Sequence, residues 1–477
     1  MIDFSNIEKY KENNRIEAKK ALGGLPQSIW ETYSAFANTL GGIILLGVEE
    51  HSDKTLHPIN LPDPEKLIND FWDGLNDSNK VSANILSEKD VTVEKVDGKR
   101  IVAIRVPRAH RNDKPVFIDG NPLSGSYRRN GEGDYKCTKE EVQTMLRDAA
   151  LETQDMAVLE NMGLEVFDYD SVKQYRIRMK ACRPGHIGEK TEDAEFLRGV
   201  GAAGKGNDGK LHPTAAGLLM FGYEYEIKKE FPSYFLDYQE RMDSDTHCSE
   251  RVFSSSGDWS GNVYDFYFRV YNNITEDVKG NIDDAPVHEA LREALANCII
   301  NADYYGKQGI SIIKKKDIIT FSNPGGFRID VETAKSGGIS DPRNSALVKM
   351  FNIIDIGESS GSGIPNIFSV WKNQGWDAPA IIESFDPDRI ILTLPIGKSV
   401  ENKTKIDENK KSASNADAHK QAVIYYLTDN VYAKSTDIAE LLGLKSARVK
   451  EILSEMINEE IIVSEGSGEN RIYKLKA

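Results

Sequence analysis

The sequence has few cysteines, and none of them belongs to a paired motif. The 477 residues contain only Cys137, Cys182, Cys248 and Cys298, and no two are spaced as Cys-x-x-Cys. This excludes a disulfide framework and a zinc site built on paired cysteines. Such usage is typical of a reducing compartment, so we expect a cytoplasmic protein.

Long apolar runs, targeting patterns and internal repeats are also missing. No run approaches the ~20 apolar residues that a membrane-spanning helix needs. Met1–Ser5 lack the basic and apolar segments that begin a signal peptide. We therefore expect no membrane partner.

Positive charge is in deficit. The chain has 60 Lys and Arg against 75 Asp and Glu, a net charge of −15. A protein this acidic is not a general polyanion binder, so any contact with nucleic acid depends on a local basic patch.

The composition is that of a folded chain with several domains. Hydrophobic residues make up 39% and charged residues 28% of the sequence. The patterning predicts a multidomain α/β (α+β) protein. We expect a first domain at 1–150, a bridging segment at 151–210, a second α/β domain at 211–397, a polar linker at 398–416 and a small unit at 417–477.

The first domain shows alternating strand and helix signals. We expect a strand at 15–19, a helix that begins at Pro26 and ends at Gly41-Gly42, and a buried strand at 43–48. A hairpin is predicted over 91–106, turning at Asp97-Gly98.

Acidic residues in this domain have a spacing that suits a cation site. Glu17 and Lys19 are two residues apart on an expected strand, so both side chains project from one face. Glu12 precedes them and Glu50 ends the buried strand. Three converging carboxylates would hold a hard divalent cation, and the lysine would stabilise charge on a phosphate. The alternative is a plain ion pair between Glu17 and Lys19.

Several stretches resemble the Schlafen/AlbA-like domain over about residues 5–148. They are Glu12 with Glu17-Ala18-Lys19, the run Ala35–Glu50, which contains Ala-Phe-Ala-Asn-Thr-Leu-Gly-Gly, and Tyr127–Gly131. In bacteria this domain is described as a DNA-binding module, and a related core in animal Schlafen proteins cleaves tRNA and rRNA with three carboxylates.

The resemblance implies Glu12, Glu17 and Glu50 as ligands of Mg²⁺ or Mn²⁺, with Lys19 beside them. The third acid is an aspartate in the animal pattern, and Glu49 competes with Glu50 for that position. The basic loop predicts nucleic-acid contacts at Arg128 and Arg129.

A polar ladder marks the second α/β domain. We expect one helix over 287–305, in which Glu289, Glu293, Asn297 and Asn301 recur every four residues beside an apolar stripe. In a partly buried site, Asn could offer an oxygen to Mg²⁺ and Glu could orient a water. The alternative is a solvated helix face.

Two glycine-rich turns follow that helix. A strand runs into Asn323-Pro324-Gly325-Gly326, and Gly357–Gly363 precedes a helix that begins near Ile364. A turn that opens a helix leaves backbone N–H groups for phosphate, whereas the alternative is a flexible connection. The candidate nucleotide contacts are Asn297, Asn301, Asn323, Gly325, Gly326, Gly357, Gly361 and Gly363.

This ordered set, with His212–Gly222 and Arg343-Asn344, resembles the divergent gyrase and histidine-kinase (GHKL) type of ATPase domain over about residues 210–397. Such a domain follows the Schlafen/AlbA-like module in RecG-like transcriptional regulators. The resemblance implies an α/β sandwich that binds ATP-Mg, with Glu293 as the water-activating base and Asn297 as a magnesium ligand. Asn323 stands where the family has an aspartate that reads adenine. No GxxxxGK[ST] loop is present, which argues against a motor helicase.

The pattern of the C-terminal unit is typical of a winged helix-turn-helix domain. Helices are expected at 421–427, from Ser435, and at 447–457, with a two-stranded wing behind them. The candidate DNA contacts are Lys445, Arg448, Lys450 and Arg471. From Glu401 onwards, 12 Lys and Arg face 13 Asp and Glu, so protein contact or dimerisation is the alternative use.

The leading hypothesis is a nucleotide-responsive, nucleic-acid-binding regulator with ATP and Mg²⁺ or Mn²⁺ as cofactors. The first alternative is a metal-dependent endonuclease that acts on tRNA, other RNA or single-stranded DNA, as in phage defence. The second is a nucleotide-gated protein-interaction switch.

Overall fold

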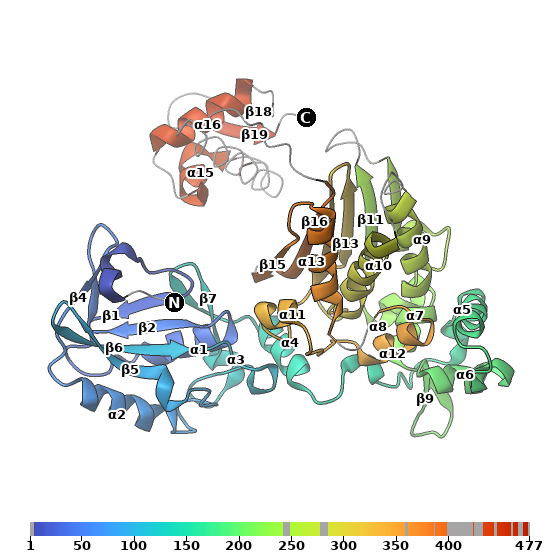
Figure 1. Ribbon diagram of the computed structural model, residues 1–477, viewed down its shortest axis with the longest axis horizontal. Helices are drawn as coiled ribbons and strands as arrows, with labels where there is room; N and C mark the ends of the chain where they lie inside the picture. The colour runs from blue at the N-terminus through green and yellow to red at the C-terminus, as the bar shows by residue number, and fades with distance from the viewer. Residues whose placement is uncertain are drawn as a thin grey trace. The chain divides into compact units, whose positions relative to one another are not determined.

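The computed structural model describes residues 4–241, 249–276, 285–357, 361–385, 387–397, 423, 433–442, 446–458, 461–465 and 471–475. The chain divides into two compact units, Met1–Ser399 and Val400–Ala477 (Figure 1). Among the helices of the described residues, none is long and apolar enough to span a bilayer.

The N-terminal part of the first unit is built on a four-stranded sheet in the order β1-β2-β6-β5. Its strands are β1 (Ile16–Lys19), β2 (Gly42–Leu46), β5 (Val91–Val96) and β6 (Lys99–Val106). Strand β1 is parallel to β2, and the other pairs are antiparallel. The predicted hairpin is confirmed, because β5 and β6 turn at Asp97-Gly98, both with positive φ.

Both faces of this sheet are covered, which explains the unbroken apolar sequence of β2. Ile44 and Leu46 pack with α1 (Ile29–Asn38) and α2 (Pro64–Leu75) in one core, whereas Ile43 and Leu45 pack in another with Ile7. A strand buried on both sides has no need for alternating polar residues. The remaining elements are β3 (Val48–Glu50), β4 (Leu56–Pro58), α3 (Pro122–Gly125), β7 (Tyr127–Asn130), β8 (Gly133–Lys136) and α4 (Lys139–Ala149).

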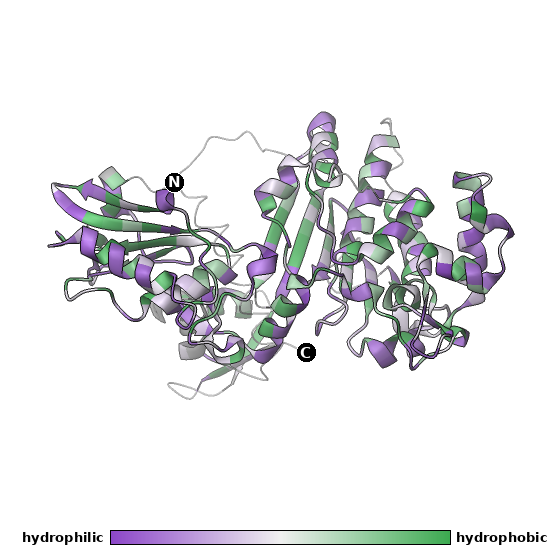
Figure 2. Ribbon diagram, turned by 90° about the horizontal axis from the view of Figure 1, so that it is seen from below, coloured by the Kyte–Doolittle hydropathy of each residue, from purple (hydrophilic) through white to green (hydrophobic). Residues whose placement is uncertain are grey.

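The central part of the same unit contains a six-stranded sheet in the order β12-β11-β13-β14-β16-β15, and only the β11–β13 pair is parallel among the described strands. Its strands are largely apolar (Figure 2). Helices α9 (Val263–Glu276), α10 (Ala285–Ile300) and α13 (Gly363–Gln374) pack with the sheet in one core, so this part is a layered α/β structure. The strands are β11 (Leu236–Arg241), β12 (Glu250–Phe253), β13 (Ile310–Lys315), β14 (Ile318–Pro324), β15 (Ala380–Phe385) and β16 (Asp388–Pro395).

Residues expected to form a bridge belong to this core. Val166, Tyr175, Phe196 and Ala203 pack in the same apolar cluster as the sheet, so 151–210 is an integral part of the central body. The helices and short strands of the body are α5 (Tyr169–Cys182), α6 (Asp193–Val200), β9 (Ala203–Lys205), β10 (Leu211–Pro213), α7 (Ala215–Phe221), α8 (Glu224–Glu230), α9 (Val263–Glu276), α10 (Ala285–Ile300), α11 (Val331–Ser336), α12 (Ser345–Ile353) and α13 (Gly363–Gln374).

Helix α10 is shorter than the 287–305 that its sequence predicts. The side-chain amide of Asn344 donates to the carbonyl oxygens of Ile300 and Ala302, both at 2.8 Å. These bonds satisfy carbonyl groups at the end of the helix. A side chain more than forty residues away in the chain therefore stabilises the end of this helix.

The second unit contains α15 (Ser435–Leu442), α16 (Ser446–Asn458) and a small sheet in the order β17-β19-β18. Its strands are β17 (Ala433–Lys434), β18 (Ile462–Glu465) and β19 (Ile472–Leu475). The linker at 398–416 and most of the helix expected at 421–427 lie outside the described residues. The winged-helix assignment stays a prediction.

Candidate nucleotide site and its link to the N-terminal part

One cavity gathers most of the predicted nucleotide contacts. It encloses about 1170 Å³ up to its open mouth, beside α10, β14 and the start of α13. The predicted residues that line it are Glu293, Asn297, Asn301, Asn323, Gly326, Gly361 and Gly363.

Two predicted glycines do not line this cavity. Gly325 has φ +91° and lies against the guanidinium of Arg343, and Gly357 lies near Ile300 and Ala296. Their assignment as nucleotide contacts stays a prediction.

Of the polar residues that recur every four positions, those from Glu293 onwards line the cavity. Glu289 is exposed, as the solvated-face alternative expects, but Glu293 is only 8% exposed. The side-chain amide of Asn297 donates to Glu293 Oε1 at 3.1 Å. A Cβ added to Gly363 would stand 2.1 Å from the same oxygen. The start of α13 therefore lies directly against Glu293, and a side chain at position 363 would have to displace that carboxylate.

This contact brings a helix N-terminus to the cavity. Gly363 and Ile364, in the first turn of the twelve-residue α13, both line it. First-turn amides lie outside a helix's own hydrogen bonds, and the helix dipole adds partial positive charge at this end. The arrangement suits a phosphate group.

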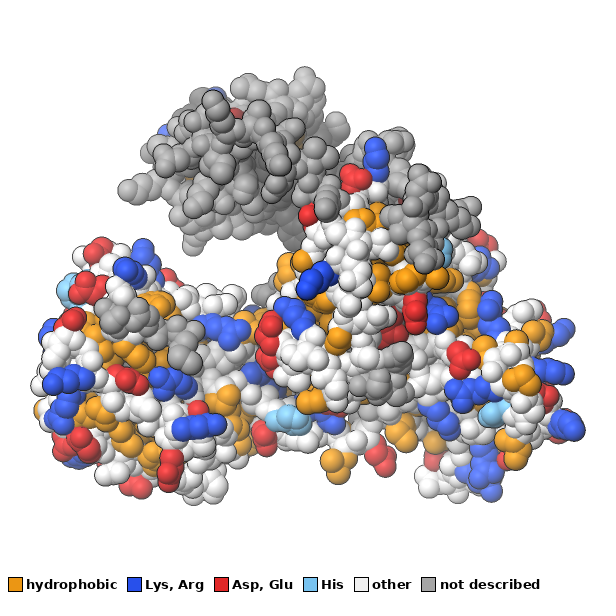
Figure 3. All heavy atoms as spheres, viewed as in Figure 1, with side chains coloured by type: hydrophobic (Ala, Val, Ile, Leu, Met, Phe, Trp, Pro, Cys, Tyr) orange, Lys and Arg blue, Asp and Glu red, His pale blue; other side chains and the backbone are white. Residues whose placement is uncertain are grey.

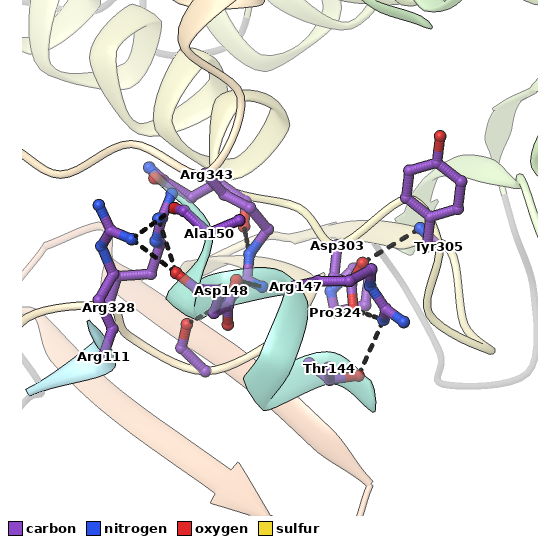
Figure 4. Close-up of polar contacts among 12 residues, drawn as sticks. Arg111, Thr144, Arg147, Asp148, Ala150, Asp303, Tyr305, Pro324, Arg328 and Arg343 are labelled. Carbon is purple, nitrogen blue, oxygen red and sulfur yellow. Dashed lines mark hydrogen bonds and ion pairs between the residues drawn. The ribbon is translucent and has the colours of Figure 1, made fainter. Parts of the chain in front are cut away.

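Arg343 connects this cavity to the N-terminal part, and sequence reasoning missed that role. Its Nε donates to Asn301 O at 3.2 Å, and its Nη2 donates to Gly326 O at 2.9 Å. Its Nη1 donates to the carboxylate of Asp148 on α4 at 2.5 Å (Figure 4). The Arg343-Asn344 dipeptide was the available signal, but its partners are distant in sequence.

Residues of the N-terminal part and Glu383 of β15 also hold the loop Gly326–Arg328 in place. Glu383, whose side chain is 3% exposed, accepts from Arg108 and from the Phe327 backbone N–H at 2.8 Å. Arg108 Nη2 also donates to Phe327 O at 2.6 Å. Arg328 Nη2 donates to Asp148 O at 3.1 Å. Residues from the N-terminal part therefore hold one wall of the cavity in place.

The three candidate metal ligands lie near one another in the N-terminal part. Burial raises the pKa of Glu12, and the charges of Glu17 and Glu50 raise it further, while the Ala18 N–H that donates to Glu12 opposes the shift. Glu50 Oε1 is buried and accepts no hydrogen bond. These features indicate a site with excess negative charge.

Glu17 is already matched by cations. Lys19 Nζ lies 2.9 Å from one of its oxygens and Arg129 Nη2 lies 2.9 Å from the other. Within the described ranges, no three His, Cys, Asp or Glu residues are grouped so as to hold a metal ion. Glu17 therefore forms ion pairs, as the alternative expects. The metal site stays a prediction.

The structure separates the two competing acids. Glu49 pairs with Lys20, and this hydrogen bond is the main reason that its pKa is lowered. Glu50 pairs with Lys54 through Oε2 at 3.3 Å, but its charge also raises the pKa of Glu12, which Glu49 does not do. Glu50 is therefore the better candidate for the third carboxylate.

The expected basic loop offers less free charge than its sequence indicates. Arg129 has 1% of its side chain exposed and donates to Glu17, to Asp134 and to backbone carbonyls. These contacts give Arg129 a structural role, and its assignment as a nucleic-acid contact stays a prediction. Arg128 pairs with Glu141. On the face drawn in Figure 3, acidic and basic side chains are interspersed.

The candidate DNA contacts of the second unit are only partly described. Lys450 and Arg471 are exposed. Lys445 and the side chain of Arg448 lie outside the described residues. Their role stays a prediction.

Comparison with known families finds matches to three stretches of the chain. A family model described as "Schlafen, AlbA_2" matches residues 12–138, and one described as "Putative ATP-dependent DNA helicase recG C-terminal" matches 307–393. A domain of unknown function matches residues 143–237. No curated protein matches the chain.

Two solved structures are similar to parts or all of the chain. The DIP2311 protein from Corynebacterium diphtheriae is 16% identical, with a TM-score of 0.40, over 97% of this chain and 95% of that one. The N-terminal domain of a putative ATP-dependent DNA helicase RecG-related protein from Nitrosomonas europaea is 31% identical, with a TM-score of 0.23, over 29% of this chain and 95% of that one.

Proposed function

Because the chain belongs to the Schlafen/AlbA-like proteins that carry a RecG-type C-terminal ATPase-like domain, we propose that it is a nucleotide-responsive, nucleic-acid-binding regulator. The nucleotide would be ATP with Mg²⁺, held in the cavity beside α10.

The residues of this cavity have complementary roles in the proposal. The Asn297 side chain donates to Glu293, which leaves its amide oxygen available for Mg²⁺. Glu293 is placed to orient a water, and the first turn of α13 faces the phosphates. The magnesium ion would neutralise phosphate charge. Asn323 is 5% exposed in the wall and would meet the base.

The regulatory part of the proposal depends on one wall of the cavity, because the residues of that wall also contact the N-terminal part. Gly326, Phe327, Arg328 and Arg343 line the cavity, and the same loop and arginine bind Arg108, Glu383 and Asp148. A ligand that displaces this wall would change the contacts between the wall and the N-terminal part. Such a ligand shifts a conformational equilibrium by its difference in affinity for the two states.

Nucleotide binding is tested by titrating labelled ATP with Mg²⁺ into the full chain. We expect Asn297→Ala to weaken binding at least tenfold. Asn207→Ala is a matched control, because Asn207 is exposed and bonds only with Glu160 among the described residues. Equal affinity of the wild type and Asn297→Ala contradicts the assignment.

The response is tested by measuring the affinity for double-stranded DNA and for tRNA with and without ATP. We expect ATP to change it, and nucleic acid to change the affinity for ATP by the same factor. Asp148→Asn should abolish the mutual effect and keep ATP binding, because Asp148 does not line the cavity. Persistence of the full effect in Asp148→Asn argues against this route.

A second candidate function, a metal-dependent endonuclease, is favoured by the negative charge around Glu12. The buried, unpartnered Glu50 Oε1 beside a carboxyl of raised pKa would suit a bound cation. Glu12 and Glu50 would hold the ion, and Lys19 would leave Glu17 for the phosphate as the ion enters.

The test compares cleavage of tRNA and single-stranded DNA in Mn²⁺ and in EDTA. Glu50→Gln should abolish cleavage, whereas Glu49→Gln should retain it, because Glu49 pairs with Lys20. Absence of metal-dependent cleavage by the wild type removes this candidate.

A further inference from the structure

A second cavity lies behind the wall of the first. It encloses about 760 Å³ up to its mouth, and Gly326, Phe327 and Arg328 line both cavities. The N-terminal part supplies one side of it, including Lys114, and the central part supplies the other, including Asp388. No candidate residue from the sequence other than Arg128 and Gly326 belongs to it.

Most charges in this second cavity are matched within the protein. Arg108 pairs with Glu383, and Arg128 pairs with Glu141. Arg111 and Arg328 both pair with Asp341, and Asp148 pairs with Arg343, which leaves one cation and one anion over.

The cation and the anion that are left over are Lys114 and Asp388. Lys114 Nζ donates to Asn38 O at 2.8 Å and forms no ion pair within the described part of the chain. The Asp388 carboxylate accepts no hydrogen bond from any described residue. Its Oδ1 lies 3.3 Å from the point where a Cβ on Gly326 would stand, so it abuts the shared wall.

Burial disfavours the charged form of both side chains. Desolvation lowers the pKa of Lys114 to about 7, with Arg108 adding to the shift and Glu383, Asp388 and Asp148 opposing it. Desolvation raises the pKa of Asp388 to about 6, against the pull of Arg343. A fully charged ligand would bring its own desolvation cost into such a site, whereas a neutral ligand with polar edges would satisfy both groups more cheaply.

We propose that this second cavity binds a nucleobase, with guanine preferred. The two oxygens of the Asp388 carboxylate match the adjacent N1–H and N2–H donors of guanine, and the Lys114 amine matches its O6. Adenine, cytosine and uracil do not present two N–H donors on neighbouring atoms. Phe327, Phe385 and Met145 supply the apolar lining that a flat ring requires.

The proposal goes beyond the ATP site and depends on different side chains. The guanine can come from a free nucleoside or nucleotide, or from an unpaired position in a bound strand. In either case its occupancy would act on Gly326–Arg328, and hence on the first cavity, from behind.

The first test measures binding of guanosine, adenosine, cytidine and uridine to the full chain by calorimetry. We expect guanosine to bind at least tenfold more tightly than the others. Lys114→Met should weaken it at least tenfold, whereas Lys99→Met should not, although Lys99 also donates to a backbone carbonyl. Equal affinity for the four nucleosides, together with no guanine-dependent binding of single strands, overturns the proposal.

A change of specificity separates recognition from mere structural damage. Asp388→Asn should weaken guanosine at least tenfold and strengthen xanthosine, because xanthine carries a carbonyl at C2 to which an asparagine amide can donate. An unfolded or distorted variant would lose both ligands. Unchanged binding of guanosine by Asp388→Asn overturns the assignment.

The source of the base is decided by adding short single strands with one unpaired guanine or none. Binding of guanosine itself identifies a free ligand, whereas guanine-dependent binding of strands alone, lost in Asp388→Asn, identifies a polymer. Guanosine binding should persist in Asn297→Ala. Failure of the ATP site and failure of the guanine site are therefore distinguishable.

Discussion

Arg343 donates from Nη1 to the carboxylate of Asp148 across 2.5 Å, and this ion pair joins the wall of one cavity to helix α4 (Figure 4). The Arg343 side chain is 9% exposed and that of Asp148 is 19% exposed. Its partners make Arg343 a link between α10, the turn after β14 and the N-terminal part.

Asp148→Asn is expected to destabilise the first unit. Removing one partner of a largely buried pair leaves the other charge unmatched, which costs about 2–3 kcal/mol at this degree of exposure. Urea denaturation measures the loss. Asp193→Asn is the control, because Asp193 pairs with Arg176 at 55% exposure and should cost less than about 1 kcal/mol. Equal losses in the two variants would contradict the structural role of Asp148.

Gly363→Ala is expected to weaken ATP binding at least tenfold. The added Cβ would stand 2.1 Å from Glu293 Oε1 and would displace that carboxylate. Gly199→Ala is the matched control on α6, because an added Cβ there has nothing within 4 Å. The control should keep ATP affinity and gain roughly 0.5–1 kcal/mol in stability, since alanine favours a helix over glycine. Undiminished ATP affinity in Gly363→Ala would show that the cavity is not the ATP site.

Asp388 is expected to make the ligand-free protein less stable as the pH rises from about 4 to 6. Its folded pKa of about 6 lies above the unfolded value, so the folded state binds the extra proton in this range. Asp388→Asn lacks this loss and should therefore be the more stable form at pH 7, by roughly 2–3 kcal/mol.

The measurement is urea denaturation of both forms between pH 4 and 8. The difference in unfolding free energy should grow from pH 4 to 6 and then level off. Asp73→Asn, an exposed substitution on α2, should show a constant difference. A pH-independent gap for Asp388→Asn would be inconsistent with the raised pKa.

Mn²⁺ is expected to raise the Tm of the wild type, because an ion that binds only the folded state stabilises it. Glu12→Gln should remove this rise. Without metal, Glu12→Gln should be at least as stable as the wild type at pH 7, because a raised folded pKa means that folding penalises the charged form. Glu49→Gln should keep the rise, and a rise in Glu12→Gln equal to that of the wild type would argue against the site.

Local patterns predicted much of the fold. The turn at Asp97-Gly98 joins β5 to β6 as expected, since two positive φ angles suit those residues. The four-residue repeat on α10 placed Glu293, Asn297 and Asn301 on one face, and that face lines the cavity. Helical periodicity alone determines which side chains share a face.

What the sequence by itself determined is therefore the buried strand β2, the hairpin of β5 and β6 and the polar face of α10, because these follow from neighbours a few residues apart. Only the tertiary structure decided that Arg129 is buried, that Asn344 ends α10, and that Lys114 and Asp388 share a cavity. Each of these depends on partners tens or hundreds of residues away. Burial and charge pairing arise only when the folded chain brings such partners together, so no local pattern records them.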